Sequence, residues 1–252
     1  IGIVRDETDY REVLYGDVIY TGSVSPAYSN NNNQHYEALE NQNINLQADL
    51  VRQQQSDVTG LTTDATAGIM TTRAASRAFF VDGTNRAMFR FTMLNHLCYD
   101  MEQIKDNTRS ADRIRQDVSR SPGGDSRLFL TNCLGCHAGM DPMTQAFANY
   151  EWGYKDINPD DPDTGRLVYT PGVVQEKYHI NATNFKGGYF TRDSGWSNYW
   201  RNGPNAWLGW GENPTPAFNA NVSIDSKGVS SGVGAKSLGM ELAHTDAFAR
   251  CQ

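Results

Sequence analysis

Hydrophobic residues in this chain recur mainly at helical spacing, and the longest such pattern lies in the first half. It predicts a helix from about residue 82 to Met101, capped at its start by Asp82 or Thr84. A sparser apolar stripe predicts an earlier helix over residues 35–55. The apolar residues of the longer helix include Met88, Phe89, Met93, Leu94 and Leu97.

Shorter helices are expected in the second half. One covers residues 110–118, and an amphipathic helix over 125–130 follows a Pro-Gly-Gly breaker. Asp141 and Pro142 read as the start of another helix, because aspartate caps helix N-termini and proline is tolerated in the first turn. Residues 235–250 form the last predicted helix.

The remaining segments predict loops and short strands. Residues 13–20 have strand-like content, whereas 153–234 are rich in Gly, Pro, Asn and Asp and read as loops with one short helix over 194–201. The patterns together predict a mainly α fold with long irregular loops and a few short strands. We expect an N-terminal, mostly helical part over 1–110 and a second part over 111–252, or one continuous domain.

Composition narrows the class of protein. The 252 residues are 38% hydrophobic and carry a formal net charge of -7, which argues against nucleic acid and anionic membrane as main partners. No apolar run is long enough to span a bilayer. Because the chain begins at Ile1 rather than methionine, we expect a mature form or a fragment.

Residues 133–137 read Cys-Leu-Gly-Cys-His, which is the C-x-x-C-H spacing of a c-type haem attachment site. Each cysteine sulfur would bond to one vinyl group of the porphyrin, and the histidine would be held under the iron as its proximal ligand. The motif therefore predicts one covalent haem c, attached at Cys133 and Cys136, with His137 as iron ligand. Cytochrome c-like helices would surround this haem.

Two other uses of C-x-x-C fit less well. A zinc site needs a second ligand pair of similar spacing, whereas Cys98 and Cys251 stand alone in the sequence. A thioredoxin-type redox pair should follow a buried strand, and no such hydrophobic strand precedes Cys133.

The cysteine count also indicates a compartment. Haem c is attached outside the bacterial cytoplasm, so we expect a periplasmic or extracellular protein. Cys98 and Cys251 are then the two remaining thiols in an oxidising environment, and we expect a disulfide between them, the alternative being two separately buried thiols.

The second axial ligand of the iron separates an electron carrier from an enzyme. Met140 and Met143 follow His137 too closely to reach the opposite face of the porphyrin, so we expect them to pack against the haem. His179 is the first candidate for the distal ligand, and Met240 is the second. The other candidates are His244, His96 and Met101, of which His96 reads as a packed core residue.

Two weaker patterns remain. Alternating oxygen ligands can bind calcium, although an EF-hand pattern fails here and a solvated turn is the alternative; the residues are Asp156, Asn158, Asp160, Asp161 and Asp163. Aromatic rings crowd residues 196–210, where core or haem packing is favoured over sugar stacking; the residues are Trp196, Tyr199, Trp200, Trp207 and Trp210.

Several segments together resemble the C-terminal cytochrome-like module of large secreted bacterial proteins, best known from planctomycetes. The resemblance rests on islands: 9–14, the loop over 67–72, a helix with Arg86 and Arg90 that ends in Leu97-Cys98, the basic stretch 113–117, C-x-x-C-H followed by Asp141-Pro142, the aromatic segment 147–152, and Phe-Ala-Arg-Cys at 248–251. It implies a secreted or periplasmic haem c protein and no particular substrate. The family helix continues past the final cysteine, whereas this chain stops at Gln252.

The leading functional prediction is single-electron transfer by the covalent haem, with a redox protein as partner. The chain is longer than haem binding requires, so the surplus surface predicts docking or self-assembly, such as a homo-oligomer or a polymer with haems in series. One alternative is a haem c peroxidase or oxidase with an open distal site, in which His179 acts as acid–base. The other is a polysaccharide-binding module built on Trp207 and Trp210, with a structural haem.

Overall fold

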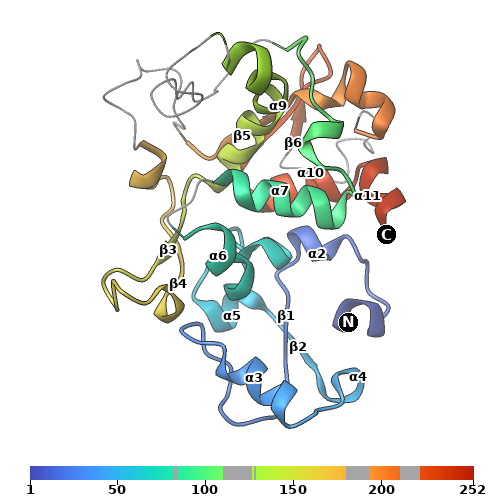
Figure 1. The fold of residues 1–252 in the computed structure, drawn as a ribbon. Helices are drawn as coiled ribbons and strands as arrows, with labels where there is room; N and C mark the ends of the chain where they lie inside the picture. The colour runs from blue at the N-terminus through green and yellow to red at the C-terminus, as the bar shows by residue number, and fades with distance from the viewer. Residues whose placement is uncertain (82–84, 110–126, 128, 180–192, 211–221) are drawn as a thin grey trace.

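The computed structural model describes residues 1–81, 85–109, 127, 129–179, 193–210 and 222–252. Figure 1 shows the fold of the chain. The α-helices are α1 (Gly2–Arg5), α2 (Glu12–Tyr15), α3 (Gln34–Asn41), α4 (Leu46–Asp49), α5 (Gln55–Thr59), α6 (Arg73–Phe79), α7 (Asn85–His96), α9 (Leu134–Thr144), α10 (Gly234–Ala243) and α11 (Asp246–Cys251). The strands are β1 (Ile19–Thr21), β2 (Val51–Gln53), β3 (Tyr150–Gly153), β4 (Arg166–Tyr169), β5 (Gly195–Asn198), β6 (Val222–Ile224) and β7 (Ser230–Val233).

The prediction of a mainly α fold is wrong. The structure is mixed, with 48% helix and 12% strand, and its strands form three small antiparallel sheets. β1 pairs with β2, β3 pairs with β4, and β7 lies between β5 and β6. Each strand is only three or four residues long, so its alternation of apolar and polar positions is too short to stand out from a loop.

Several predicted helices are also shorter than expected. The helix expected over 35–55 is divided into α3, α4 and α5, with β2 between the last two. Asn43 adopts a left-handed conformation with φ of 54°, which ends α3. The helix expected over 194–201 is strand β5 followed by a short 3₁₀ turn. The helix expected over 110–118 lies outside the described residues.

The predicted C-terminal helix is present as two helices. α10 ends at Ala243, and Thr245 then caps α11 by accepting a hydrogen bond from the backbone N–H of Phe248. The long helix expected from residue 82 is α7, which ends at His96 because Cys98 takes a left-handed conformation with φ of 57°.

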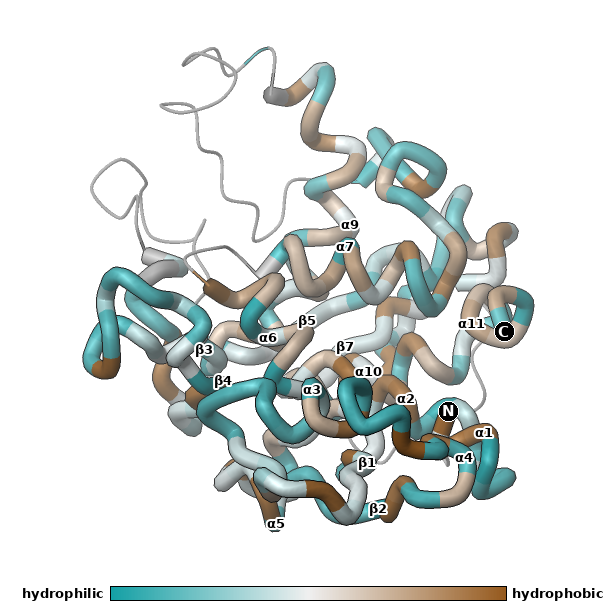
Figure 2. Tube along the Cα trace, turned by 60° about the horizontal axis from the view of Figure 1, so that its bottom comes forward, coloured by the Kyte–Doolittle hydropathy of each residue, from teal (hydrophilic) through white to brown (hydrophobic). Residues whose placement is uncertain are grey.

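The largest core cluster draws side chains from both sides of residue 110. Leu14, Phe89 and Met93 belong to it together with Phe147 and Leu238, and all five are buried. Helix α2 packs against α10, and α7 packs against α9. Figure 2 shows hydrophobic stretches where α2 lies beside α10. The described residues of the two predicted parts therefore share one hydrophobic core.

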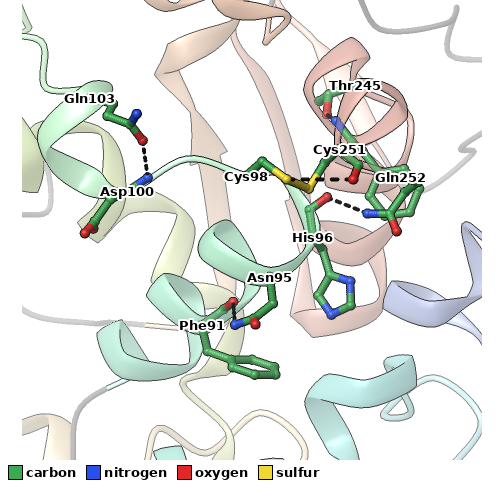
Figure 3. The surroundings of a disulfide bond; sticks show 10 residues. Phe91, Asn95, His96, Cys98, Asp100, Gln103, Thr245, Cys251 and Gln252 are labelled. Carbon is green, nitrogen blue, oxygen red and sulfur yellow. Dashed lines mark hydrogen bonds between the residues drawn. A yellow bond between two sulfur atoms is a disulfide. The ribbon is translucent and has the colours of Figure 1, made fainter.

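Cys98 and Cys251 form a disulfide, which confirms the predicted pairing. Figure 3 shows that the bond joins the segment after α7 to the last turn of α11. Gln252 adds a hydrogen bond of 3.1 Å from its side-chain amide to the carbonyl oxygen of His96. A disulfide is compatible with a periplasmic or extracellular location. None of the helices in the described ranges is long and apolar enough to cross a membrane.

His96 is buried beside this disulfide, as expected for a packed core residue. Its ring lies edge-on to Phe91, with 6.2 Å between the ring centroids. Neither ring nitrogen has a hydrogen-bond partner. Burial lowers the pKa of His96, because the imidazolium would lose its hydration.

Replacing either Cys98 or Cys251 by serine should destabilise the folded chain. The bond spans a sequence separation of 153, and closing so long a loop removes much entropy from the unfolded chain. We expect a loss of about 3–5 kcal/mol, seen as a Tm lower by about 10 °C. Thermal unfolding followed by circular dichroism measures this. The double variant should lose no more than either single variant, and an unchanged Tm would contradict the expectation.

His96 should make the fold sensitive to acid. Because its pKa is lowered in the folded state, the unfolded chain binds the proton first, and stability falls as pH drops through about 6.5 toward the folded pKa. The variant His96→Phe should remove about 1 kcal/mol of this loss between pH 7.5 and 5.5. Urea unfolding at both pH values measures it, with His244→Gln as the control that should behave like wild type. Equal pH dependence in wild type and His96→Phe would refute this role.

Candidate haem attachment site

The C-x-x-C-H motif lies on one continuous helical segment. A π-helical turn, Phe129–Cys133, leads directly into α9, and Cys136 and His137 occupy its first turn. The chain thus enters the motif from a helix rather than from a strand. This arrangement differs from a thioredoxin-type dithiol, which follows a buried strand.

Helix α9 is exposed at its start and buried along the rest of its length. Cys133, Leu134, Cys136 and His137 are partly exposed, whereas every residue from Ala138 to Thr144 is buried. Leu130 precedes the motif and is 50% exposed. The accessible side of this segment is therefore apolar apart from the thiols and the imidazole.

Asp141 lies one helical turn after His137 and faces it. The Nδ1 atom of His137 is 3.1 Å from each carboxylate oxygen of Asp141. The same carboxylate accepts two hydrogen bonds of 2.7 Å from Arg86 of α7, one from Nε and one from Nη2. Asp141 is only 4% exposed, so it connects a buried ion pair to the motif histidine.

The charge of Asp141 is maintained despite its burial. Desolvation disfavours the carboxylate, but the charge of Arg86 and the hydrogen bonds from His137 and Arg86 outweigh that effect and lower the pKa of Asp141 to about 2. An ionised carboxylate only accepts hydrogen bonds, so Nδ1 of His137 carries the hydrogen in this pair. The ring then presents Nε2 as its ligand nitrogen.

The sequence interpretation of Asp141 as a helix N-cap is wrong. Helix α9 starts at Leu134 and continues through Asp141 and Pro142 to Thr144. Pro142 lacks the N–H that would bond to the carbonyl of Ala138, and the helix tolerates this loss two residues before its end. The side chain of Asp141 is therefore directed to His137 and Arg86 instead of to a helix terminus.

Two glycines of α9 allow close contacts around the motif. A Cβ atom on Gly139 would lie 2.0 Å from Nε1 and Cε2 of Trp200, so the indole packs directly on the helix backbone. A Cβ atom on Gly135 would lie 2.3 Å from Oδ1 of Asn107. The backbone N–H of Asp106 also donates to the carbonyl of Gly135 at 2.8 Å, which holds this segment against the motif.

A buried carboxylate helps to hold the segment that carries Trp200. Glu241 of α10 is 2% exposed and accepts a hydrogen bond of 3.0 Å from Asn198. It also pairs with Arg201 at 3.4 Å. Since Asn198 and Arg201 flank Trp200, these contacts fix its position over α9.

The two motif cysteines are free thiols, as haem attachment requires. Burial, followed by the charge of Glu102, raises the pKa of Cys136. A dithiol that exchanges disulfides depends on a lowered thiol pKa, so this environment does not favour that activity. The thiol of Cys136 contacts the carbonyl oxygen of Met101 at 3.5 Å.

The structure places the candidate distal ligands in different regions. His179 ends a 3₁₀ turn, Glu176–His179, but its side chain lies outside the described residues. Met240 is half-buried on α10, and its carbonyl accepts a hydrogen bond from Nδ1 of His244 at 2.7 Å. Met101 is buried beside Cys136. The assignment of His179 or Met240 as distal ligand stays a prediction.

Met140 and Met143 are buried in the main hydrophobic core, Met143 completely. Their contact with a haem stays a prediction. Three of the tryptophans, Trp196, Trp200 and Trp210, are also buried, which confirms that they pack in the core. Trp207, in contrast, is 88% exposed.

The acidic loop does not gather a calcium site. Within the described ranges, no group of three or more His, Cys, Asp or Glu side chains is placed to hold a metal ion. Asn158 and Asp161 accept hydrogen bonds from nearby backbone N–H groups, and Asp163 pairs with Arg77 at 2.7 Å. These side chains stabilise the turn.

Sequence reasoning missed the roles of Arg86 and Asp141 at the motif. A signal for Asp141 was present, because His137 and Asp141 are four residues apart and would share one face of a continuous helix. Arg86 gave no comparable signal, since its contact depends on the packing of α7 against α9. Comparison of the chain with protein-family models, curated proteins and solved structures finds no match.

The variant Gly139→Ala should destabilise the protein, although alanine normally favours a helix interior by about 1 kcal/mol over glycine. The added methyl group would overlap the Trp200 ring, and we expect a net loss of about 2 kcal/mol in urea unfolding. The same substitution should cost less in a Trp200→Phe background, where the smaller ring leaves more room. Equal costs in the two backgrounds would show that this contact is not responsible.

Proposed function

We propose that this chain is a monohaem c-type cytochrome that transfers single electrons. Haem c would be attached at Cys133 and Cys136, and Nε2 of His137 would be the proximal ligand. The observation that carries the proposal is the arrangement on one helical segment of two free thiols and a histidine whose Nδ1–H is directed to Asp141. When bound, the haem iron supplies a one-electron couple between its ferric and ferrous states.

The residues of the site fit this group. A haem-ligating histidine needs its second ring nitrogen engaged by an acceptor that fixes its orientation, and Asp141 is that acceptor here. The partly exposed apolar residues Leu130 and Leu134 lie beside the thiols, where the hydrophobic porphyrin could cover them. The same exposure would leave one haem edge accessible to a redox partner.

The cellular setting we propose is the bacterial periplasm or exterior. The Cys98–Cys251 disulfide supports it, since such bonds persist in oxidising compartments. A redox protein is the proposed partner, and self-association that places haems in series is the proposed use of the surplus surface. His179 or Met240 would complete the six-coordinate iron of an electron carrier.

A peroxidase or oxidase is the second candidate. The charged partner of His137 favours it, because a carboxylate makes the proximal nitrogen a stronger electron donor than a neutral acceptor would. Such an enzyme needs an open distal face and an acid–base group beside it.

Expression in a host that attaches haem c should yield a protein that retains haem on a denaturing gel. The double variant Cys133→Ala and Cys136→Ala should lose covalent haem completely, whereas the control Cys98→Ser should retain it. Haem staining and the pyridine haemochrome spectrum measure both. A wild-type protein without covalent haem would refute the proposal.

Carbon monoxide distinguishes the two candidate functions. A low-spin spectrum that carbon monoxide does not change indicates a closed iron and supports the electron carrier. A high-spin spectrum that shifts with carbon monoxide indicates an open distal face and supports the enzyme.

A further inference from the structure

The carboxylate of Asp141 lies between a cation and the motif histidine. Arg86 binds it with two hydrogen bonds of 2.7 Å, and Nδ1 of His137 lies 3.1 Å from both of its oxygens. The carboxylate is 4% exposed, whereas the Arg86 side chain is 25% exposed. Water therefore screens the interaction between Asp141 and His137 only weakly.

We infer that Asp141, held by Arg86, is the positioning residue of the proximal ligand: it directs Nε2 of His137 to the iron and lowers the reduction potential of the haem. This inference rests on the proposed function and deepens it. It assigns to the chain a means of setting the potential, in residues that the C-x-x-C-H motif does not include.

The direction of the effect follows from charge. An anionic acceptor draws the Nδ1 hydrogen toward itself and makes Nε2 more basic, so the histidine donates more strongly to the iron. The ferric state carries one more positive charge than the ferrous state, and a buried anion nearby stabilises it. Both effects favour oxidation, which means a lower reduction potential.

Arg86 should act in the opposite direction. Its positive charge compensates the carboxylate and so weakens both effects at the iron. Removing the cation should therefore lower the potential further, whereas removing the anion should raise it. A purely structural role would not produce shifts of opposite sign.

Redox titration at pH 8 of the haem-loaded protein tests the inference. Asp141→Asn keeps the size and an acceptor oxygen but removes the charge. It should shift the ferric–ferrous equilibrium about tenfold toward the ferrous state, which is about 59 mV for one electron. Arg86→Gln should shift the equilibrium toward the ferric state. Arg86→Lys, which keeps the charge, should restore most of the wild-type potential.

The matched control is Arg90→Gln. Arg90 lies one turn further along α7 and pairs with Asp100 at 2.8 Å, so this variant removes the same charge from the same helix without touching Asp141. Its potential should stay close to wild type. Far-UV circular dichroism and haem content identify folded variants, and the Arg86 pair carries the test if Asp141→Asn does not fold.

The outcomes separate the two proposals. Haem-loaded variants whose potentials do not move, or move in the same direction for Asp141→Asn and Arg86→Gln, would overturn the inference and leave the cytochrome assignment intact. A wild-type protein that carries no covalent haem would overturn the cytochrome assignment, and the inference with it.

Discussion

The packing of α7 on α9 depends on one buried negative charge. An ionised carboxylate at 4% exposure is costly unless it is paired and hydrogen-bonded, and Asp141 meets both conditions through Arg86 and His137. The pair connects two helices that lie far apart in the sequence. It also determines which nitrogen of His137 carries hydrogen. A single compensated charge thereby links the tertiary packing to the chemistry of the motif.

The rest of the site is built by close contacts around α9. Gly139 brings the helix backbone against Trp200, and Glu241 holds the segment on which Trp200 lies. The buried half of α9 is thus fixed by the core, while its first turn presents the thiols and the imidazole at an accessible side. This division gives a rigid support for side chains that must hold a large planar group.

The sequence predicted what depends on local spacing. The attachment motif, the Cys98–Cys251 pairing and the burial of His96 and Trp200 could be inferred from residue types and their intervals. The three small sheets could not, because strands of three or four residues owe their pairing to partners distant in the chain. Asp141 was misread for a related reason, since Asp-Pro is a strong local signal that the packed helix overrides.

The disulfide also changes the connectivity of the chain. Covalently, residues 98 to 251 form a closed ring that includes the whole attachment motif, with the first 97 residues as a branch. One cleavage of the backbone anywhere inside that ring opens it but releases no fragment. A protease that nicks this part of the molecule once would therefore leave the motif joined to both ends of the protein until the bond is reduced.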